Sequence, residues 1–533
     1  MVSPELKNKV GQLMVFGFKG KTASPEIKKL IRDHHVGGII LFGRNIGTPE
    51  EVLALTTELQ REAKKAGHEK PLLICLDQEN GVVRRLGEGT TVFPGAMLLG
   101  ATKSPENAYA ISAATAKELK ALGLNWNLAP VVDVNNNPEN PVIGVRSFGE
   151  SPEQVSLFGQ NAMQGMQDVG VITTLKHFPG HGDTNVDSHL DLPVITHEMD
   201  RLEEIELKPF KDCIDKGADV IMTAHVYFPA IEDRENVPAT LSHKVINGLL
   251  REKLGFNGVV TTDCMEMNAI ADNIGTAQGG VEAIKAGVDL IMVSHLHTRH
   301  FETINEILKA VNRGEIDEKT IDAAYGRVMK LKEKYLSWED IQLEGELEVS
   351  ETVGCKQHEF EAAEVYRQGV TIVKNEKELI PLSLDKEERI LVVYPENNLI
   401  MQVEDRRYSS FSLEESIREF HEHTDVMKFS NPPTEEEVTH ILEAAKHYST
   451  VIVGTLTALP GSQQVRLVEV LNKLTKNLIV IATRSPYDLT YFPGISTYIC
   501  TYEFTYPALR TAASAIFGKK KVSGELPVTI PNL

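Results

Sequence analysis

Short, continuous apolar runs alternate with amphipathic helical stretches over the first part of the chain. They occupy residues 12–18, 37–42, 71–77, 126–133, 171–178, 220–225, 258–263 and 290–294. Continuous apolar strands separated by helices are typical of a parallel sheet that helices cover on both faces. Eight such runs predict an α/β fold with an N-terminal (β/α)8 TIM-type barrel. A doubly wound open sheet is the alternative, but no Gly-x-Gly-x-x-Gly follows the first run, so its dinucleotide-binding form has no support.

Polar side chains stand at the ends of several of these runs. They are Asp77, Asp133, Lys176 with His177, His225 and Asp263. A single Asp at such a position is equally well explained as a helix N-cap. In a (β/α)8 barrel, however, the C-terminal ends of the strands meet on one face and bear the active site. Several polar strand ends therefore predict a pocket on that face.

A second α/β unit is expected after the barrel. Residues 303–336 are typical of a closing helical pair, and residues 337–352 are acidic and weakly periodic. Helical patterns follow at 357–370, 434–447 and 462–475, and strand-like runs at 389–394, 451–454, 478–482 and 497–500. The predicted organisation is a catalytic barrel over residues 1–336, a linker over 337–352 and a smaller α/β/α sandwich domain over 353–533.

Charge and composition narrow the classes of partner and compartment. The formal net charge is −20, which disfavours binding to nucleic acid or to anionic lipid, since both need clustered Lys and Arg. No apolar run is long enough to span a membrane, and the N-terminus lacks the apolar stretch of a signal peptide. The five cysteines show no paired spacing, so we expect a reducing, cytoplasmic location.

The segment 176–189 holds one Lys, three His and two Asp within fourteen residues. It reads Lys-His-Phe-Pro-Gly-His-Gly-Asp-Thr over 176–184, and Asp-Ser-His follows at 187–189. Buried charges need partners, so such a cluster indicates a functional site. One hypothesis is a zinc site of a barrel hydrolase, with His177, His181, Asp183 and His189 as the candidate ligands. The neighbouring Lys176 would repel a metal ion.

The second hypothesis for this segment is proton transfer. Asp187 and His189 are two residues apart, which allows the carboxylate to orient the imidazole and to stabilise its charged form. An imidazole can then protonate a leaving group and later accept a proton. Asp263, at the end of the seventh run, is the candidate nucleophile or charge stabiliser facing it. His181 and Asp183 are expected to brace the loop.

Several segments resemble glycoside hydrolase family 3, and specifically its β-N-acetylglucosaminidases. The long motif over 176–189 matches the family signature at nearly every position. Residues 76–85, 142–149 and 262–267 are similar to further family elements, and residues 371–375 and 524–529 resemble parts of its second domain. Asn80 and Val82, which flank Asp77, depart from the usual family residues and leave the detailed sugar preference open. In the segment 262–267, Cys264 stands where the family commonly has a second Asp.

The resemblance implies an enzyme with no cofactor and no metal, acting on a carbohydrate. It implies a retaining, exo-acting β-N-acetylglucosaminidase that works by double displacement through a covalent glycosyl-enzyme. Asp263 would be the nucleophile, and Asp187 with His189 the acid/base dyad. The residues implied to bind the terminal sugar are Asp77, Arg85, Arg146, Lys176 and His177. Recycling of peptidoglycan fragments is the implied role, with chitin oligosaccharides as an alternative substrate.

Four other functions stay open at this point. A histidine acid/base need not repel an incoming phosphate, so an N-acetylglucosaminide phosphorylase is possible. A β-glucosidase would place its acid/base Glu on the second domain. A metal-dependent barrel hydrolase belongs to a different class, and so does a noncatalytic sugar-binding protein. The sequence does not determine the oligomeric state or whether the second domain reaches the active site.

Overall fold

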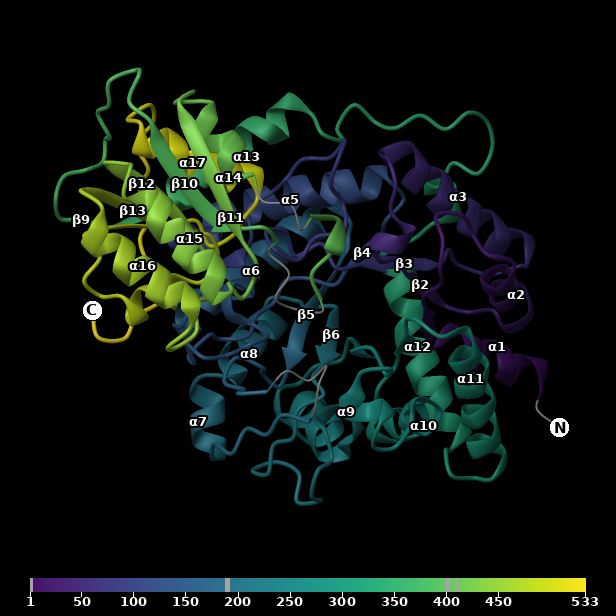
Figure 1. Cartoon of the computed structure of the whole chain (residues 1–533). Coiled ribbons are helices and arrows are strands. Elements are labelled where there is room, and N and C mark those ends of the chain that lie inside the picture. Colours follow the sequence, from purple (N-terminus) through teal and green to yellow (C-terminus); the bar gives the residue numbers. More distant parts are fainter. Residues whose placement is uncertain (1–2, 187–191, 398–402, 409–411) are drawn as a thin grey trace.

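A computed structural model describes residues 3–186, 192–397, 403–408 and 412–533 of the chain (Figure 1). The first unit is an eight-stranded parallel sheet in the order β7-β6-β5-β4-β3-β2-β1-β8. β1 pairs with both β2 and β8, and an isolated bridge between Thr261 and Leu290 joins the two ends of the sheet. The sheet is thus a nearly closed barrel, which confirms the predicted fold class.

The strands of the barrel coincide with the apolar runs of the sequence. Every residue in them is buried, as expected for strands covered on both faces. Their bounds are β1 (Met14–Phe16), β2 (Gly38–Ile40), β3 (Leu73–Leu76), β4 (Trp126–Asn127), β5 (Ile172–Phe178), β6 (Val220–Thr223), β7 (Val259–Thr262) and β8 (Ile291–Val293).

Helices surround this sheet, and several begin with the same local signal. A Ser or Thr N-cap followed by Pro opens α1, α2, α3 and α6, and each cap oxygen accepts a backbone N–H of the first turn. The helices are α1 (Pro4–Gln12), α2 (Pro25–His34), α3 (Pro49–Lys65), α4 (Ala96–Ala101), α5 (Pro105–Ala121), α6 (Pro152–Val169), α7 (Met199–Glu204), α8 (Leu207–Asp215), α9 (Asn268–Ala271), α10 (Thr276–Ala286), α11 (His297–Asn312) and α12 (Glu318–Tyr335). Shorter or wider turns are η1 (Gly43–Asn45), η2 (Gly144–Arg146), η3 (Ala239–Leu241) and the π-helix η4 (Lys244–Lys253).

The second unit is built on a six-stranded sheet in the order β11-β10-β12-β13-β14-β9. Its strands are parallel except β9, which runs antiparallel to β14 at one edge. The strands are β9 (Thr371–Asn375), β10 (Ile390–Pro395), β11 (Thr424–Phe429), β12 (Thr450–Thr455), β13 (Asn477–Ala482) and β14 (Thr497–Cys500). The helices are α13 (Lys356–Gly369), α14 (Leu413–Arg418), α15 (Glu435–Ala445), α16 (Gln463–Leu474) and α17 (Tyr506–Ile516), with η5 (Trp338–Asp340), η6 (Arg406–Tyr408) and η7 (Pro486–Tyr491).

The two units share a buried interface. His358 on α13 lies 2.8 Å from the carboxylate of Glu118 on α5, and both side chains are buried. The carboxylate of Glu503, after β14, accepts a hydrogen bond of 2.7 Å from the backbone of Gly95 in the barrel. α12 ends at Tyr335 and α13 begins at Lys356. The division at 336 and 353 stays a prediction.

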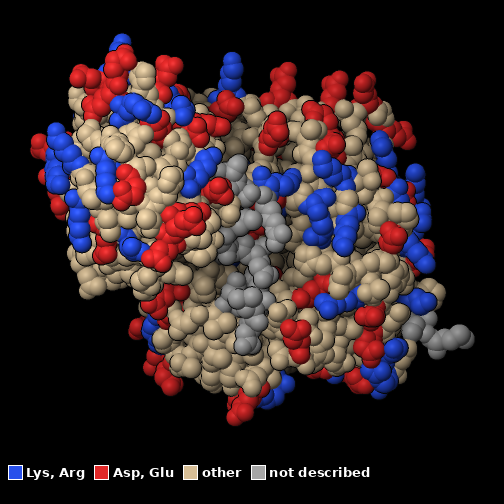
Figure 2. All heavy atoms as spheres, in the orientation of Figure 1, with Lys and Arg blue, Asp and Glu red and all other residues tan. Residues whose placement is uncertain are grey.

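The surface carries charges of both signs. In the orientation of Figure 1, Figure 2 shows acidic and basic side chains mixed over the visible face of both units. Among the described helices, none is long and apolar enough to cross a membrane.

Candidate active site

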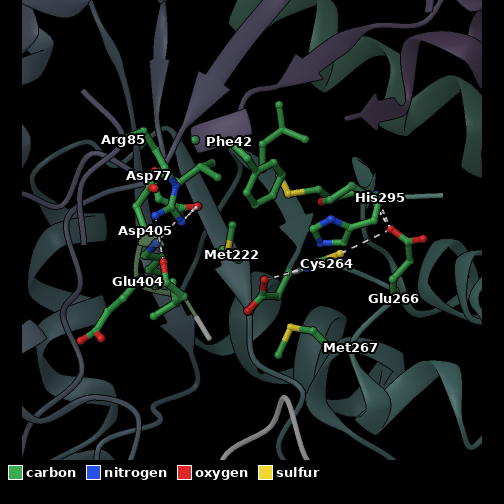
Figure 3. A pocket seen from close by; sticks show the side chains of 18 of the residues that line it. Phe42, Asp77, Arg85, Met222, Cys264, Glu266, Met267, His295, Glu404 and Asp405 are labelled. Carbon is green, nitrogen blue, oxygen red and sulfur yellow. Dashed lines mark hydrogen bonds and ion pairs between the residues drawn. The ribbon is translucent and has the colours of Figure 1, made fainter. Parts of the chain in front are cut away.

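A cavity of about 590 Å³ lies at the C-terminal ends of the barrel strands (Figure 3). It brings together six of the eight site residues predicted from the sequence: Asp77, Arg85, Arg146, Lys176, His177 and Asp263. Asp187 and His189 lie outside the described residues, so the proton-transfer dyad stays a prediction. The second unit also lines the cavity, through Val403, Glu404, Asp405 and Arg407.

Asp77, which follows β3, is held between two cationic side chains. Lys176 Nζ donates to Asp77 Oδ1 at 2.9 Å, and Arg85 Nη2 donates to Oδ2 at 3.2 Å. Burial alone would raise the pKa of Asp77, but the charges of Lys176 and Arg85 outweigh it and hold that pKa below its usual value. Asp77 is therefore an ionised acceptor at the pocket wall.

Glu79 forms a second part of the same network, which sequence reasoning missed. Arg146 grips its carboxylate with two hydrogen bonds, Nε to Oε2 at 2.9 Å and Nη2 to Oε1 at 2.8 Å. Lys176 Nζ lies 2.7 Å from Oε1. These cations lower the pKa of Glu79 far below its usual range, against the opposing effect of burial. The only sequence signal for Glu79 was its place two residues after Asp77.

His177 is oriented by Asp133 at the end of the fourth apolar run. Asp133 Oδ2 lies 2.7 Å from His177 Nδ1, and its Oδ1 accepts the backbone N–H groups of His177 and His181 at 3.1 Å and 2.8 Å. Asp133 is fully buried. The polar strand end at Asp133 had predicted a place near the pocket, but not this supporting contact. The Nε2 edge of the His177 ring is the one left for a ligand.

The segment after β5 is braced by local hydrogen bonds. His181 Nδ1 lies 2.9 Å from Thr184 Oγ1, and Asn140 Nδ2 donates to the carbonyls of His181 and Gly182 at 2.9 Å. Burial lowers the pKa of His181 to about 4, so its ring is neutral near neutral pH. Asp183 lies 2.6 Å from His197 Nε2. This geometry agrees with a bracing role for His181 and Asp183.

Asp263 follows β7 directly. Its Oδ1 accepts the backbone N–H of Cys264 at 2.7 Å, and the residue is only partly buried. It lines the same cavity as Asp77 and His177, which are anchored on β3 and β5. In Figure 3 the side chains of Asp77 and Arg85 lie on one side of Met222, and Cys264 and His295 on the other.

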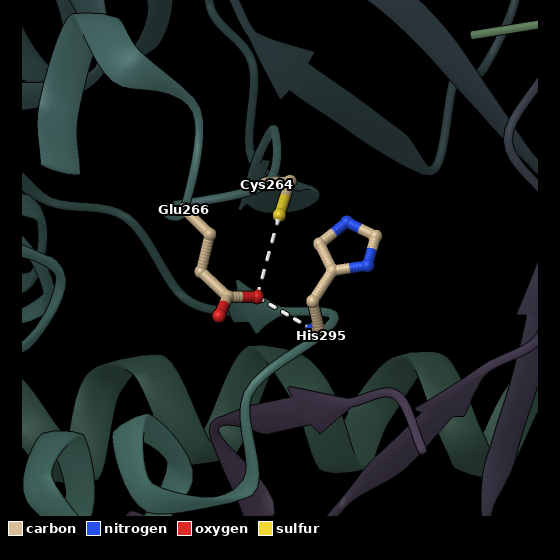
Figure 4. Close-up of side chains that lie close together, drawn as sticks. All are labelled: Cys264, Glu266 and His295. Carbon is tan, nitrogen blue, oxygen red and sulfur yellow. Dashed lines mark hydrogen bonds between the residues drawn. The ribbon is translucent and has the colours of Figure 1, made fainter. Parts of the chain in front are cut away.

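Within the part of the chain that the structure describes, two groups of side chains could each offer three ligand atoms to one metal ion. Cys264, Glu266 and His295 form the first, at the pocket (Figure 4). Glu266 Oε2 already accepts the backbone N–H groups of Ser294 and His295, at 2.9 Å and 2.5 Å. Arg44 Nη1 donates to His295 Nδ1 at 3.2 Å, and burial raises the pKa of the Cys264 thiol to about 12. The backbone contacts of Glu266 with residues 294–296 and the nearby guanidinium of Arg44 favour a role of this group in anchoring the loop after β8.

The second group is Asp183, His197 and Glu206. Arg201 lies within it: its Nη1 donates to Glu206 Oε2 at 2.7 Å, and its Nη2 is 4.0 Å from Asp183 Oδ2. The guanidinium of Arg201 thus supplies the positive charge next to these two carboxylates. Two of the zinc ligands considered from the sequence have different partners: Asp183 belongs to this group, whereas His177 pairs with Asp133.

Comparison with known proteins gives the family. The model of the glycosyl hydrolase family 3 N-terminal domain matches residues 5–331. Beta-hexosaminidase A of Pseudoalteromonas piscicida is 30% identical and covers 96% of this chain and 92% of that protein. A beta-hexosaminidase of Xylella fastidiosa (strain M23) is 35% identical over 306 residues, which are 56% of this chain and 87% of that protein.

A solved structure matches over the full length. It is a glycoside hydrolase family 3 beta-N-acetylglucosaminidase from Paenibacillus sp. str. FPU-7, with a TM-score of 0.93 and 41% identity, covering 99% of both chains. The family match, the relatives and the shared two-domain architecture agree with one another. The chain therefore belongs to glycosyl hydrolase family 3 and is a glycosidase.

Proposed function

We propose that this glycosidase is a retaining, exo-acting β-N-acetylglucosaminidase. The observation that supports it best is the joining of Asp77, Lys176, Arg146 and His177 in one cavity with Asp263. Charged donors and acceptors that converge from several strand ends suit a ligand with many hydroxyl groups. A cavity of about 590 Å³ is of the size that small-molecule sites have. The names of the matched relatives support the acetamido sugar as substrate.

In the proposed reaction, Asp263 is the nucleophile. Its carboxylate oxygen forms a bond to the anomeric carbon while the glycosidic C–O bond breaks, and the leaving oxygen takes a proton from His189. Asp187 stabilises the charged imidazole. In the second step His189 takes a proton from water, whose oxygen attacks the anomeric carbon and releases Asp263. Two inversions at one carbon retain its configuration.

The proposed sugar contacts follow from the hydrogen-bonding capacity of the wall. Asp77, ionised and held by Lys176 and Arg85, accepts from sugar hydroxyls. Lys176 and Arg146 can donate to hydroxyl oxygens. His177 uses Nδ1 for its contact with Asp133, so its Nε2 is the ring nitrogen that can hydrogen-bond to the sugar. These groups are fixed by buried ion pairs before the sugar arrives, so little reorganisation is needed on binding.

A substrate panel tests the proposal. We expect turnover of 4-nitrophenyl β-N-acetylglucosaminide, with N-acetylglucosamine as the product and an initial product of β configuration. Asp263→Asn should abolish turnover, and Asp272→Asn, a change at an exposed Asp nearby, should not. Release of N-acetylglucosamine 1-phosphate in phosphate buffer would make the enzyme a phosphorylase instead. Cleavage of the β-glucoside alone would make it a β-glucosidase, and loss of activity on chelation a metal-dependent hydrolase.

The acid/base assignment has its own test. His189→Ala should impair substrates with poor leaving groups most, because a nitrophenolate needs little protonation. An equal loss for nitrophenyl and natural glycosides would contradict the assignment. Asp187→Asn should show the same dependence on the leaving group, since it acts through His189.

The proposed natural substrates are peptidoglycan fragments, with chitin oligosaccharides as the alternative. All five cysteines are free, which suits the reducing cytoplasm proposed as the location. Competition between a muropeptide and chitobiose for one enzyme sample, measured as the ratio of kcat/KM values, separates the two substrates.

A further inference from the structure

The second domain contacts Arg85 at both of its ends. Arg407 Nη2 and Tyr408 Oη both donate to the backbone carbonyl of Arg85, at 2.6 Å and 2.9 Å. At the other end, the guanidinium of Arg85 donates through Nη1 to the carbonyl of Val403 at 2.8 Å. The segment Val403–Tyr408 therefore fixes the backbone and the side chain of one barrel residue.

This contact reaches the sugar site through one further ion pair. Arg85 Nη2 donates to Asp77 Oδ2, the carboxylate proposed to accept from the sugar. At 3.2 Å that bond is long for a charged pair, whereas the bond from Arg85 to Val403 is 2.8 Å. The position of the guanidinium over Asp77 thus depends on the second domain. Figure 3 shows Glu404 and Asp405 on the same side of the pocket as Asp77 and Arg85.

Two barrel glycines make room for the segment. A Cβ on Gly87 would lie 2.1 Å from Tyr408 Oη, and a Cβ on Gly43 would lie 2.1 Å from Asp405 Oδ2. Both distances are far shorter than any real contact of a methyl group. Neither glycine has a positive φ, so the close approach is what a larger residue would prevent. The barrel loops are shaped to receive these side chains.

The segment is itself held in a defined shape. Arg407 Nη2 donates to Asp405 Oδ2 at 2.7 Å, and the Tyr408 ring has the guanidinium groups of Arg84 and Arg407 at 4.1 Å and 5.2 Å from its centre. Behind it, Glu404 pairs with Arg484 at 2.9 Å, and both side chains are buried. A segment anchored in this way can transmit a fixed position to Arg85.

We infer that Arg407 and Tyr408 are positioning residues for the sugar site, so that the second domain sets the affinity for the terminal sugar. The inference rests on the proposed function, because it takes Asp77 and Arg85 as sugar-binding groups. None of the proposed catalytic groups lies on this segment. Loss of these contacts should therefore weaken binding of the ground state and of the transition state equally, which raises KM and leaves kcat unchanged.

The test is the double variant Arg407→Ala/Tyr408→Phe, compared with Arg389→Ala/Tyr448→Phe. The control pair removes the same groups at the β11 edge of the second sheet, where Arg389 and Tyr448 bind Asp425 at 2.6 Å and 2.8 Å. The double variant loses both hydrogen bonds to the Arg85 carbonyl and the 2.9 Å bond from Arg407 Nη1 to the carbonyl of Ile46. The loss should raise KM for 4-nitrophenyl β-N-acetylglucosaminide about tenfold, with kcat nearly unchanged. The inhibition constant of N-acetylglucosamine should rise in parallel, and the control should match wild type.

An unchanged KM and inhibition constant in the folded double variant would overturn the inference. A folding defect is distinguishable, because it lowers the active fraction and the apparent kcat while leaving KM alone. If the double variant does not fold, Tyr408→Phe is the variant to test, since it keeps the ring.

Gly87→Ala is an independent test: it displaces Tyr408 and should raise KM, whereas Gly494→Ala, which faces open space, should not. Failure of the wild type to cleave any N-acetylglucosaminide would instead refute the proposed function.

Discussion

Glu79 and Arg146 form a two-pronged ion pair beside the pocket, with contacts of 2.9 Å and 2.8 Å. Lys176 adds a third contact to the same carboxylate and also binds Asp77. Glu79 therefore pairs with two buried cations, and the network holds the groups proposed to contact the sugar in fixed positions. The proposed sugar contacts depend on a carboxylate that need not touch the sugar itself.

Glu79→Gln should destabilise the protein and weaken its activity. The change leaves Lys176 and Arg146 buried with too little negative charge, and breaking a buried pair costs about 3–5 kcal/mol. We expect a fall of that size in the unfolding free energy from urea titration, together with a fall in kcat/KM. Glu443→Gln, in an exposed pair with Lys446, is the matched control and should change neither quantity. A stable, fully active Glu79→Gln would show that the network is dispensable.

Asp133→Asn should reduce the affinity for the sugar. Its carboxylate accepts from His177 and from two backbone N–H groups, so the amide loses the charge that orients the ring. Hydrogen bonds to a charged group contribute about 1.5–3 kcal/mol, which corresponds to a loss of roughly 10- to 100-fold in kcat/KM. Kinetics with the nitrophenyl substrate measure it. Asp215→Asn, at an exposed position of α8, should behave as wild type.

The sequence predicted the barrel well because its strands are buried on both faces and therefore consist of unbroken apolar runs. The same reasoning found β10, β12, β13 and β14, which lie inside the second sheet. It missed β11, Thr424–Phe429, because that strand lies at the edge and has partly exposed side chains, among them Asp425 and Lys428. An edge strand has one open side, so burial does not impose a continuous apolar pattern.

The place of a side chain in the cavity was predictable where a polar residue ends an apolar strand, as at Asp77, Lys176 and Asp263. It was not predictable where the contact joins distant loops. Arg146 and Glu79 are 67 residues apart, and Arg85 and Val403 are 318 apart. Such contacts leave no periodic pattern in the sequence, because only tertiary packing brings the partners together. For Arg85 and Val403 it is the packing of the second domain on the barrel. The sequence left open whether that domain reaches the pocket, and the structure shows that it does, through Val403, Glu404, Asp405 and Arg407.

The unfolding free energy should decrease as the pH is lowered, because buried histidines bind a proton more readily in the unfolded chain. Burial lowers the pKa of His68 from 6.5 to about 4, so between these values the unfolded chain binds a proton that the folded protein does not. The unfolding free energy then decreases as the pH falls from about 6.5 to 4, by about 1.4 kcal/mol per pH unit at most for this group. His68→Gln, which keeps a donor for the carbonyl of Ile31, should flatten that slope.

Urea titrations at several pH values measure the slope for both proteins. His423→Gln, at a half-exposed position in the second domain, is the control and should leave it unchanged. An identical slope for His68→Gln and wild type would mean that His68 is not the titrating group.

Glu118→Gln should weaken the contact between the two domains. The carboxylate of Glu118 accepts the backbone N–H of Thr91 at 3.0 Å and lies 2.8 Å from Nδ1 of His358 across the interface. Both side chains are nearly inaccessible to water, so removal of the charge should lower the unfolding free energy by about 3 kcal/mol. Glu359→Gln, at an exposed position of the same helix α13, should have no effect. Because Glu118 does not line the pocket, KM at low temperature should stay at its wild-type value. A raised KM in folded Glu118→Gln would mean that the interface and Arg85 are coupled more tightly than their separate contacts indicate.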